Sequence, residues 1–387
     1  NASTKTTLLR ENINENTIKN LEKRGYVLPI NYFKLKDEFK NIKIKIETIQ
    51  NKMNKNLHVP EDKILLKELK NEENIIMNKI NEIIYLTPNI LHHTVPNGKN
   101  AEDNPVIKEE LFNIELKNLP KIDHAIKGKD LGMNTELGVN LAHARFTVMR
   151  GKVAKVHRKL INMALDHYGN NGYEEFYLPN LVNKDTMFGT GQYPNFKEQL
   201  FTTQGNDELF LIPTGEVPLT NIVANKIWPK NELEQKLMTH TPCFRKEAGT
   251  YGKDTKGILR QHQFEKVELV RTCQPENGLH NFYEMVADIE VFIKQFHIPY
   301  RIIELCAGDI GFAGHKAYDF EMWFPGEAKF REIATITWCH DFQARRMNFK
   351  YKDNGKNLFG HTLNGTGLAV GRLLAALIEN DRLEDFV

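Results

Sequence analysis

The side chains best suited to chemistry lie in the stretch HTPCFRKEAGTYGKDTKGILRQHQFEKVELV, residues 240–270. Two strand-like runs carry them at a spacing of two: Arg245 and Glu247 on the first, and Phe264, Lys266 and Glu268 on the second. Because side chains alternate along a strand, each set should share one face. Arginine can bond two phosphate oxygens, a flat ring can stack on a base, and a carboxylate can accept from an amine. The stretch predicts a site for an anion and a base; the alternative is an edge hairpin with surface ion pairs.

The same stretch resembles motif 2 of the class II aminoacyl-tRNA synthetases, in the form found in seryl-tRNA synthetases. That form reads F-R-x-E-A-G, then G-x-D-T-x-G, then R-x-H-Q-F-x-K-V-E, and nearly every fixed position is present. Residues 363–372 (LNGTGLAVGR) resemble motif 3, and residues 212–219 (IPTGEVPL) resemble the family's serine-binding T-x-E loop. Pro179 lies where motif 1 places a proline at the dimer interface. The resemblance covers nearly the whole chain, from about residue 7 to 380.

This resemblance implies an ATP site. Arg245 would hold the α-phosphate and the reacting carboxylate, and Arg260 would contact the γ-phosphate end of a bent ATP. Arg372 would stack on one side of adenine and also meet the γ-phosphate, so Arg245 and Arg372 are the implied catalytic residues. Phe264 would stack on the other face of adenine, and Glu247 would receive its amino group.

The resemblance also implies a metal site and an amino-acid pocket. Glu332 and Thr335 would hold the Mg²⁺ that bridges the phosphates. The serine pocket would be lined by Thr214, Glu216, Arg245, Glu268, Asn364 and Thr366. The implied reaction forms seryl-adenylate and pyrophosphate from serine and ATP, then transfers serine to the 3′ end of tRNA(Ser) and, by resemblance, of tRNA(Sec). It needs no protein nucleophile, so catalysis would be positioning and charge stabilisation.

One run departs from the family pattern. After Arg331-Glu332-Ile333 the family has S-S-C-S-N, whereas this chain has residues 334–338, Ala-Thr-Ile-Thr-Trp. Thr335 keeps a hydroxyl, but Trp338 replaces a small polar residue beside the site. This departure is the only support for an alternative function, a catalytically silent relative that binds tRNA. Retention of the arginines and carboxylates of an ATP site argues against it.

Two heptad seams predict a long helical hairpin over about residues 31–88. Its a/d positions are Leu35, Phe39, Ile42, Ile46, Ile49 and Met53, then Leu66, Leu69, Glu73, Ile76, Ile80 and Ile83. The link around Pro60 is too short for anything but an antiparallel reversal. A shorter helix that includes Leu8–Arg10 and stops near Gly25 is predicted before the hairpin.

The first helix of this hairpin is rich in lysine, and Lys36, Lys40 and Lys43 are its predicted contacts with RNA phosphates. The alternative is an ordinary solvated helix face. By resemblance, the hairpin lies where bacterial-type members carry their tRNA-binding arm. A third function, a ligase that charges a carrier protein, is disfavoured because such relatives lack the arm.

The rest of the chain predicts an α+β domain. Strand-like runs cluster at 145–149, 173–178, 209–212, 264–270, 300–304 and 318–324, and helices are predicted at 153–167 (ended by Gly169), 279–296 and 368–380. Few crossovers favour a mostly antiparallel sheet with flanking helices, the class II catalytic fold. We therefore expect an N-terminal tRNA-binding domain (1–100) and a catalytic domain (101–387), with motif 1 at about 153–180, motif 2 at 240–270 and motif 3 at 360–380. Residues 89–130 are predicted to be largely linker.

Composition limits the remaining possibilities. The net charge is +2, so a basic nucleic-acid surface must be local. The four cysteines show no C-x-x-C spacing, which argues against a zinc site or a disulfide framework and fits a reducing cytoplasm. The pair His92-His93 has no zinc-site spacing either. No apolar run approaches the ~18 residues that a membrane span requires. The expected molecule is a cytoplasmic homodimer that uses ATP with Mg²⁺ and no zinc.

Overall fold

The computed structural model describes residues 13–387, and the chain divides into two compact units, Asn1–Ile90 and Leu91–Val387. The segment after residue 90 hydrogen-bonds within the second unit: His92 N donates to His315 O, and Ala307 N donates to Pro96 O. Within the described residues, no helix is long and apolar enough to cross a membrane.

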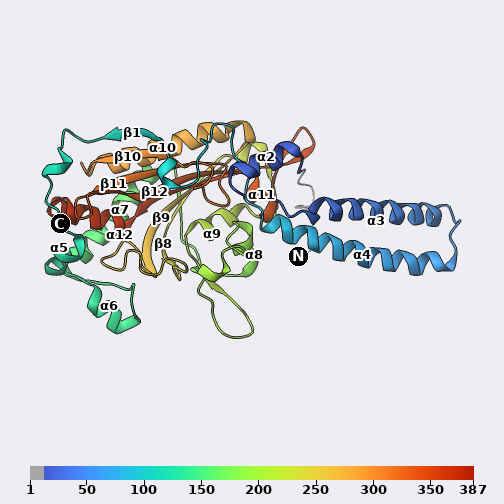
Figure 1. The fold of residues 1–387 in the computed structure, drawn as a ribbon, viewed down its shortest axis with the longest axis horizontal. Coiled ribbons are helices and arrows are strands. Elements are labelled where there is room, and N and C mark those ends of the chain that lie inside the picture. Colours follow the sequence, from blue (N-terminus) through green and yellow to red (C-terminus); the bar gives the residue numbers. More distant parts are fainter. Residues whose placement is uncertain (1–12) are drawn as a thin grey trace. The chain divides into compact units, whose positions relative to one another are not determined.

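The first unit contains the predicted helical hairpin (Figure 1). Its helices are α2 (Glu15–Lys23), α3 (Asn31–Asn54) and α4 (Pro60–Tyr85). Pro60 opens α4, where a proline costs no hydrogen bond, and Val59 N donates to the Asp62 carboxylate at 2.9 Å. Gly25 ends the preceding helix at φ +76°. The Leu8–Arg10 part of the predicted first helix lies outside the described residues.

The heptad seams form the core of this hairpin. Ile42, Ile46 and Ile49 of α3 pack with Leu69 of α4 in one apolar cluster. The sequence placed Ile83 at the last seam position, but Ile84 is the buried residue there, at 1% exposure, and Ile83 is half-buried. A drift of this kind is expected because an α-helix has 3.6 rather than 3.5 residues per turn.

An eight-stranded sheet organises the second unit, in the order β1-β10-β11-β12-β15-β9-β8-β4. The strands are β1 (Val106–Glu110), β10 (Tyr300–Glu304), β11 (Lys316–Phe324), β12 (Lys329–His340), β15 (His361–Ala369), β9 (Gln263–Cys273), β8 (Gln235–Phe244) and β4 (Glu174–Phe176). Every neighbouring pair is antiparallel except β4 and β8, which are parallel. The predicted mostly antiparallel sheet is confirmed.

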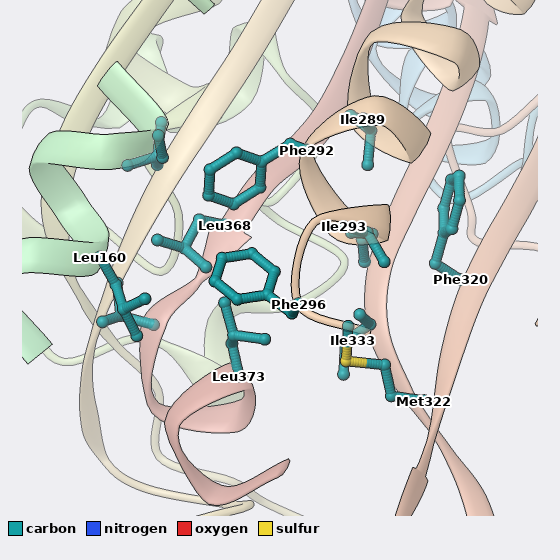
Figure 2. Close-up of a cluster of buried hydrophobic side chains, with 14 of the residues drawn as sticks. Leu160, Ile289, Phe292, Ile293, Phe296, Phe320, Met322, Ile333, Leu368 and Leu373 are labelled. Atoms are coloured by element: carbon teal, nitrogen blue, oxygen red, sulfur yellow. The ribbon is translucent and has the colours of Figure 1, made fainter. Parts of the chain in front are cut away.

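Three helices cover one face of this sheet: α7 (Gly151–Asn170), α10 (Gly278–Lys294) and α12 (Val370–Glu379). Figure 2 shows the packing, in which Phe292 of α10 and Phe296, just after the helix, lie among Leu160, Leu368 and Leu373. Burying each such side chain stabilises the fold by roughly 1.5–3 kcal/mol. This core occupies one side of the sheet, and the polar side chains of Lys266 and Glu268 on β9 point to the other side.

Smaller elements surround the sheet. The strands are β2 (Met133–Asn134), β3 (Val148–Met149), β5 (Leu181–Val182), β6 (Phe210–Leu211), β7 (Lys226–Pro229), β13 (Phe349–Asp353) and β14 (Lys356–Phe359). The helices are α5 (His124–Leu131), α6 (Thr135–Ala142), α8 (Lys184–Gly189), α9 (Glu216–Thr220) and α11 (Phe342–Met347). The strands β14, β13 and β7 form a separate three-stranded sheet.

Three expectations from the sequence were wrong in detail. The predicted linker 89–130 contains β1 and α5. β1 pairs with β10 at the sheet edge, and its side chains are largely exposed, including the apolar Val106 and Ile107. The predicted strand 145–149 is reduced to β3, because Arg145 has φ +66° and breaks extended pairing. Gly169 does not end α7, because a glycine inside a helix costs only ~1 kcal/mol and the helix continues to Asn170. The chain reverses instead at Gly172, which has φ +90°.

Candidate active site

A cavity of about 640 Å³ lies against the polar side of the sheet. Ten of the predicted site residues line it: Thr214, Glu216, Arg245, Glu247, Arg260, Phe264, Glu332, Asn364, Thr366 and Arg372. The other two stand behind lining residues, Glu268 in an ion pair with Lys266 (2.9 Å) and Thr335 in a hydrogen bond to Glu332 (3.0 Å). Four segments distant in sequence, the motif-2 hairpin, β12, β15 and the 213–216 loop, therefore converge on one site.

Strand alternation explains much of this convergence. Along β9, Val267 and Leu269 belong to the apolar core, whereas Lys266 and Glu268 point the opposite way. The polar face of β9 is thus the predicted one, and the period of two is confirmed there.

Gly365 and Gly367 let helices approach the other side of β15. A Cβ at Gly365 would lie 2.7 Å from the Met285 sulfur of α10, and one at Gly367 would lie 2.8 Å from the Tyr168 ring of α7. The register of β15 on β9 shifts at Gly367, between Thr366 and Leu368. This bulge lies where the strand turns into α12 and its Arg372.

Arg245 and Glu247 reach the cavity by a different route from the one predicted. The strand β8 ends at Phe244, so the two residues do not share a strand face. Glu247 has φ +54° in the following loop. The Arg245 Nε donates to Pro213 O at 3.0 Å, and its guanidinium lies 5.1 Å from the Phe264 ring centroid. Loop geometry and a stacked ring, rather than strand alternation, position this arginine.

A β-bulge brings the two predicted metal ligands together. Glu332 and Thr335 are three residues apart, which would place them on opposite faces of a regular strand. Phe320 pairs with Ala334 and Glu321 pairs with Glu332, so Ile333 is an extra residue in β12. The bulge returns both side chains to one face, where the Thr335 hydroxyl donates to Glu332 Oε1 at 3.0 Å.

One hydrogen-bonded set in the cavity, the arginine network, consists of Glu247, Asp254, Arg260, Glu332 and Arg372. Arg260 Nε donates to Asp254 at 2.9 Å, and its NH1 lies 3.4 Å from the Glu247 carboxylate. Arg372 donates to the main-chain oxygens of Leu259 (3.1 Å) and Glu332 (2.7 Å).

Charge pairing sets the ionisation of this network. Desolvation opposes ionisation of Glu332, but Arg372 and the Thr335 hydroxyl outweigh it and lower its pKa. Partial burial of Asp254 is likewise outweighed by Arg331 and Arg260, which lower its pKa. Both carboxylates therefore keep their charge, and the arginines are held in place before any ligand arrives.

A second set, the carboxylate network, consists of Thr214, Glu216, Lys266, Glu268 and Asn364. Lys266 Nζ donates to the Thr214 hydroxyl at 2.8 Å and pairs with Glu268. Asn364 Nδ2 donates to Glu216 Oε1 at 3.0 Å. Burial, and then repulsion from Glu268, raises the pKa of Glu216 to about 7; burial also raises the pKa of Glu268. Such buried oxygens are suited to an ammonium group and a hydroxyl.

Trp338 does not lie beside the cavity as the sequence suggested. With Ala334 and Ile336 it belongs to the core side of β12, and a Cβ at Gly278 of α10 would lie 2.4 Å from its ring. Its Nε1 donates to His361 Nδ1 at 3.2 Å. Thr335 and Thr337, which alternate with these residues, point to the cavity side, and Thr337 lines it. The altered run therefore leaves the polar face of β12 polar.

The residues near Glu332 fit a divalent cation. Asp319 pairs with Thr335 across β11 and β12, and its buried Oδ1 has no hydrogen-bond partner. Burial and the Glu332 charge raise the pKa of Asp319. An ionised carboxylate, a hydroxyl and an orphaned carboxyl oxygen make a hard-oxygen set of the kind that Mg²⁺ prefers.

A second acidic cluster, Asp123, His124 and Glu379, has its ligand atoms within 4.8 Å of one another. Its atoms are already bonded: His124 Nδ1 to Glu379 (2.5 Å), His124 Nε2 to Ile258 N (3.0 Å), and Glu379 Oε1 to Gly326 N (2.8 Å). The cluster ties the end of the motif-2 loop to α12. It explains why Gly257 is required, since a Cβ there would lie 2.0 Å from His124 Nε2.

Sequence reasoning missed several contributors to the site. Asp254 lies in the G-x-D-T-x-G part of motif 2, so it carried a detectable signal. Lys266 was placed on the polar strand face, but its bonds to Thr214 and Glu268 were not predicted. Asp319 and Gln343 lie in segments with no motif-like feature and reach the site only through the folded sheet and α11.

Comparison with known proteins decides the family. Residues 197–381 match the tRNA synthetase class II core domain (G, H, P, S and T). The serine–tRNA ligase of Neisseria meningitidis serogroup C is 48% identical over 309 residues, which cover 77% of this chain and 70% of that protein. The Coxiella burnetii serine–tRNA ligase is 40% identical over 401 residues, covering 98% and 94%. The chain belongs to the serine–tRNA ligase family.

Solved structures of this family agree. Seryl-tRNA synthetase from Pyrococcus horikoshii, solved in complex with ATP, has a TM-score of 0.87 at 30% identity and covers 95% of this chain and 92% of that one. The cytoplasmic serine–tRNA ligase of Naegleria fowleri, in complex with AMP, has a TM-score of 0.84 at 28% identity, covering 94% and 89%. The resemblance predicted from the motifs is confirmed, and with it the class II fold.

Proposed function

We propose that this member of the serine–tRNA ligase family activates serine with ATP and transfers it to tRNA(Ser), and also to tRNA(Sec). One observation carries the proposal: residues of both the arginine and the carboxylate networks line a single cavity of about 640 Å³. Arginines suit the phosphates, the Phe264 ring suits adenine, and buried carboxylates suit the ammonium and hydroxyl of serine. A site that hydrogen-bonds a substrate hydroxyl can also reject the analogue that lacks it.

In the first step a serine carboxylate oxygen attacks the ATP α-phosphorus, and pyrophosphate leaves. Arg245 lies at the Phe264 ring and at Pro213, beside Thr214 and Glu216, so it can hold both reacting anions. Arg260 and Arg372 would bind the departing phosphates. In the second step the terminal ribose hydroxyl of the tRNA attacks the adenylate carbonyl, and AMP leaves. The residues act by positioning and by neutralising charge.

Mg²⁺ would be held by Glu332 and Thr335, with the Asp319 carboxyl beside them. When bound, it would supply positive charge that neutralises the phosphates of ATP. In this chain Glu332 also accepts from Arg372, so cation and arginine would share one carboxylate.

The remaining partners follow from the surface. Lys40 and Lys43 of α3 are exposed and Lys36 is half-buried, which supports contact with tRNA phosphates. Near the exposed Pro179, Tyr177 is fully exposed and Leu181 is 44% exposed, and such an apolar surface supports a homodimer through motif 1. Four buried free cysteines support a reducing cytoplasm as the compartment.

The silent alternative loses its only support, because Trp338 faces the core and the polar face of β12 is intact. A carrier-protein ligase is disfavoured by the helical hairpin. The test is ATP–pyrophosphate exchange with each of the twenty amino acids. Exchange with serine alone is expected; its absence from folded protein would overturn the proposal, and exchange with another amino acid would reassign the carboxylate network.

A further inference from the structure

We propose that Gln343 is a positioning residue for amino-acid recognition: its amide fixes the Glu216 carboxylate so that one oxygen faces the substrate ammonium. This inference rests on the proposed function and deepens it. Gln343 does not line the cavity and is fully buried, at 0% exposure. It acts through Glu216, from the first turn of α11.

The two oxygens of Glu216 have different environments. Oε1 accepts from Gln343 Nε2 at 2.7 Å and from Asn364 Nδ2 at 3.0 Å. Among residues 13–387 no hydrogen bond reaches Oε2, although the side chain lines the cavity. Two amide donors on one oxygen fix the plane of the carboxylate and leave the other oxygen for a ligand.

The orientation of the Gln343 amide is itself fixed. The buried Thr362 hydroxyl donates to Gln343 Oε1 at 2.6 Å, and Gln343 Nε2 also donates to Thr190 O at 3.3 Å. A flipped amide would place its oxygen against the Glu216 carboxylate and against the Thr190 carbonyl. Three segments distant in sequence therefore hold this amide in one orientation.

A neutral donor is the appropriate partner here. Glu216 faces Glu268, Lys266 and Arg245 from the motif-2 hairpin, and the Cys339 thiol from β12. From α11 and β15, its hydrogen-bond donors among the described residues are the neutral amides of Gln343 and Asn364. Hydrogen bonds to a carboxylate favour its ionised form without cancelling its charge. Gln343 thus lowers the pKa of Glu216, which burial would otherwise raise further than about 7, and the negative charge stays available for the ammonium.

The test compares Gln343→Met, which keeps length and removes the amide, with wild type in serine-dependent exchange from about pH 6 to 9. Loss of a hydrogen bond to a charged group should raise the KM for serine about tenfold at neutral pH. Because Glu216 would then ionise only at higher pH, the acid limb of kcat/KM should move upward by about one unit. The KM for ATP should stay within about twofold, and serine binding should recover in part at high pH.

Two further variants make the result decisive. Thr362→Val is isosteric and removes only the hydroxyl that holds Gln343. It should therefore raise the KM for serine and the pH of the acid limb of kcat/KM, each by less than Gln343→Met does. This variant also replaces Gln343→Met as the test if Gln343→Met does not fold. Gln295→Met, at the end of α10 and away from the cavity, should change neither.

Equal rises in the KM values for serine and ATP, or an unshifted pH profile in both the Gln343 and the Thr362 variants, would overturn the inference while leaving the proposed function in place. Absence of serine exchange in the wild type would overturn the proposed function and this inference together.

Discussion

The carboxylate and arginine networks solve the problem of buried charge in different ways. In the carboxylate network, Lys266 and Glu268 are buried and pair with each other, and Gln343 supplies a neutral donor to Glu216. In the arginine network, Arg260 and Arg372 keep 31% and 22% of their side chains exposed and are held by carboxylates and main-chain carbonyls.

This difference indicates how each substrate would be received. The carboxylate network is held in place before a ligand binds, so recognition there would need little rearrangement. A substrate that lacks the hydroxyl would leave buried groups unpaired. The arginines hold temporary partners that phosphate oxygens would share or replace. Because these donors are already oriented, little reorganisation of the protein is needed during the reaction.

The largest effect should come from Arg245, which lies between the two networks. Arg245→Ala removes the group that would neutralise both reacting anions, so serine-dependent exchange should fall about 10²–10³-fold. Circular dichroism should show an unchanged fold. Arg382→Ala is the matched control, because the Arg382 side chain forms an ion pair with the exposed residue Asp385, away from the cavity. Normal exchange in the Arg245 variant would place phosphate binding elsewhere.

A smaller, one-sided effect is expected from Asp254→Asn. Asp254 holds Arg260 at 2.9 Å and Arg331 at 2.7 Å, so the variant should loosen Arg260 and raise the KM for ATP by about tenfold. The KM for serine should not change, because the carboxylate network is untouched. Asp385→Asn controls for loss of an exposed carboxylate. A parallel rise in both KM values would mean that the two networks are not independent.

A weaker effect is expected at Thr335, a proposed Mg²⁺ ligand. Thr335→Val keeps the shape of the side chain and removes the hydroxyl beside Glu332, so half-maximal exchange should need several-fold more Mg²⁺. Thr337→Val, on the same face of β12 but without a bond to Glu332, is the comparison. An identical Mg²⁺ titration for the two variants would argue against Thr335 as a ligand.

The smallest effect on either network should follow changes in the hairpin. Replacing Lys36, Lys40 and Lys43 by alanine should leave exchange unchanged and lower tRNA charging several-fold, with a weaker dependence on salt. The same change at Lys63, Lys67 and Lys70 of α4 tests which helix contacts the RNA. Undiminished charging by both triple variants would contradict the proposed role of the hairpin.

Much of the site was accessible from sequence, because motif residues carry chemistry that few residue types can perform. Phe264, Lys266 and Glu268 followed strand periodicity as expected. The geometry of Arg245 and Glu247 did not, since β8 ends one residue before Arg245. The linker prediction failed because an edge strand such as β1 has no apolar face to signal it.

From the sequence alone, the resemblance of the motif residues indicated the family, and local periodicity indicated the helical hairpin and the strands of the antiparallel sheet. Only the tertiary structure decided which side chains meet. The Ile333 bulge joined Glu332 to Thr335, and alternation along β12 turned Trp338 into the core. Gln343 reached Glu216 from 127 positions away. Such contacts depend on strand register and helix packing. Because the whole core sets these, the local sequence around each residue does not predict them.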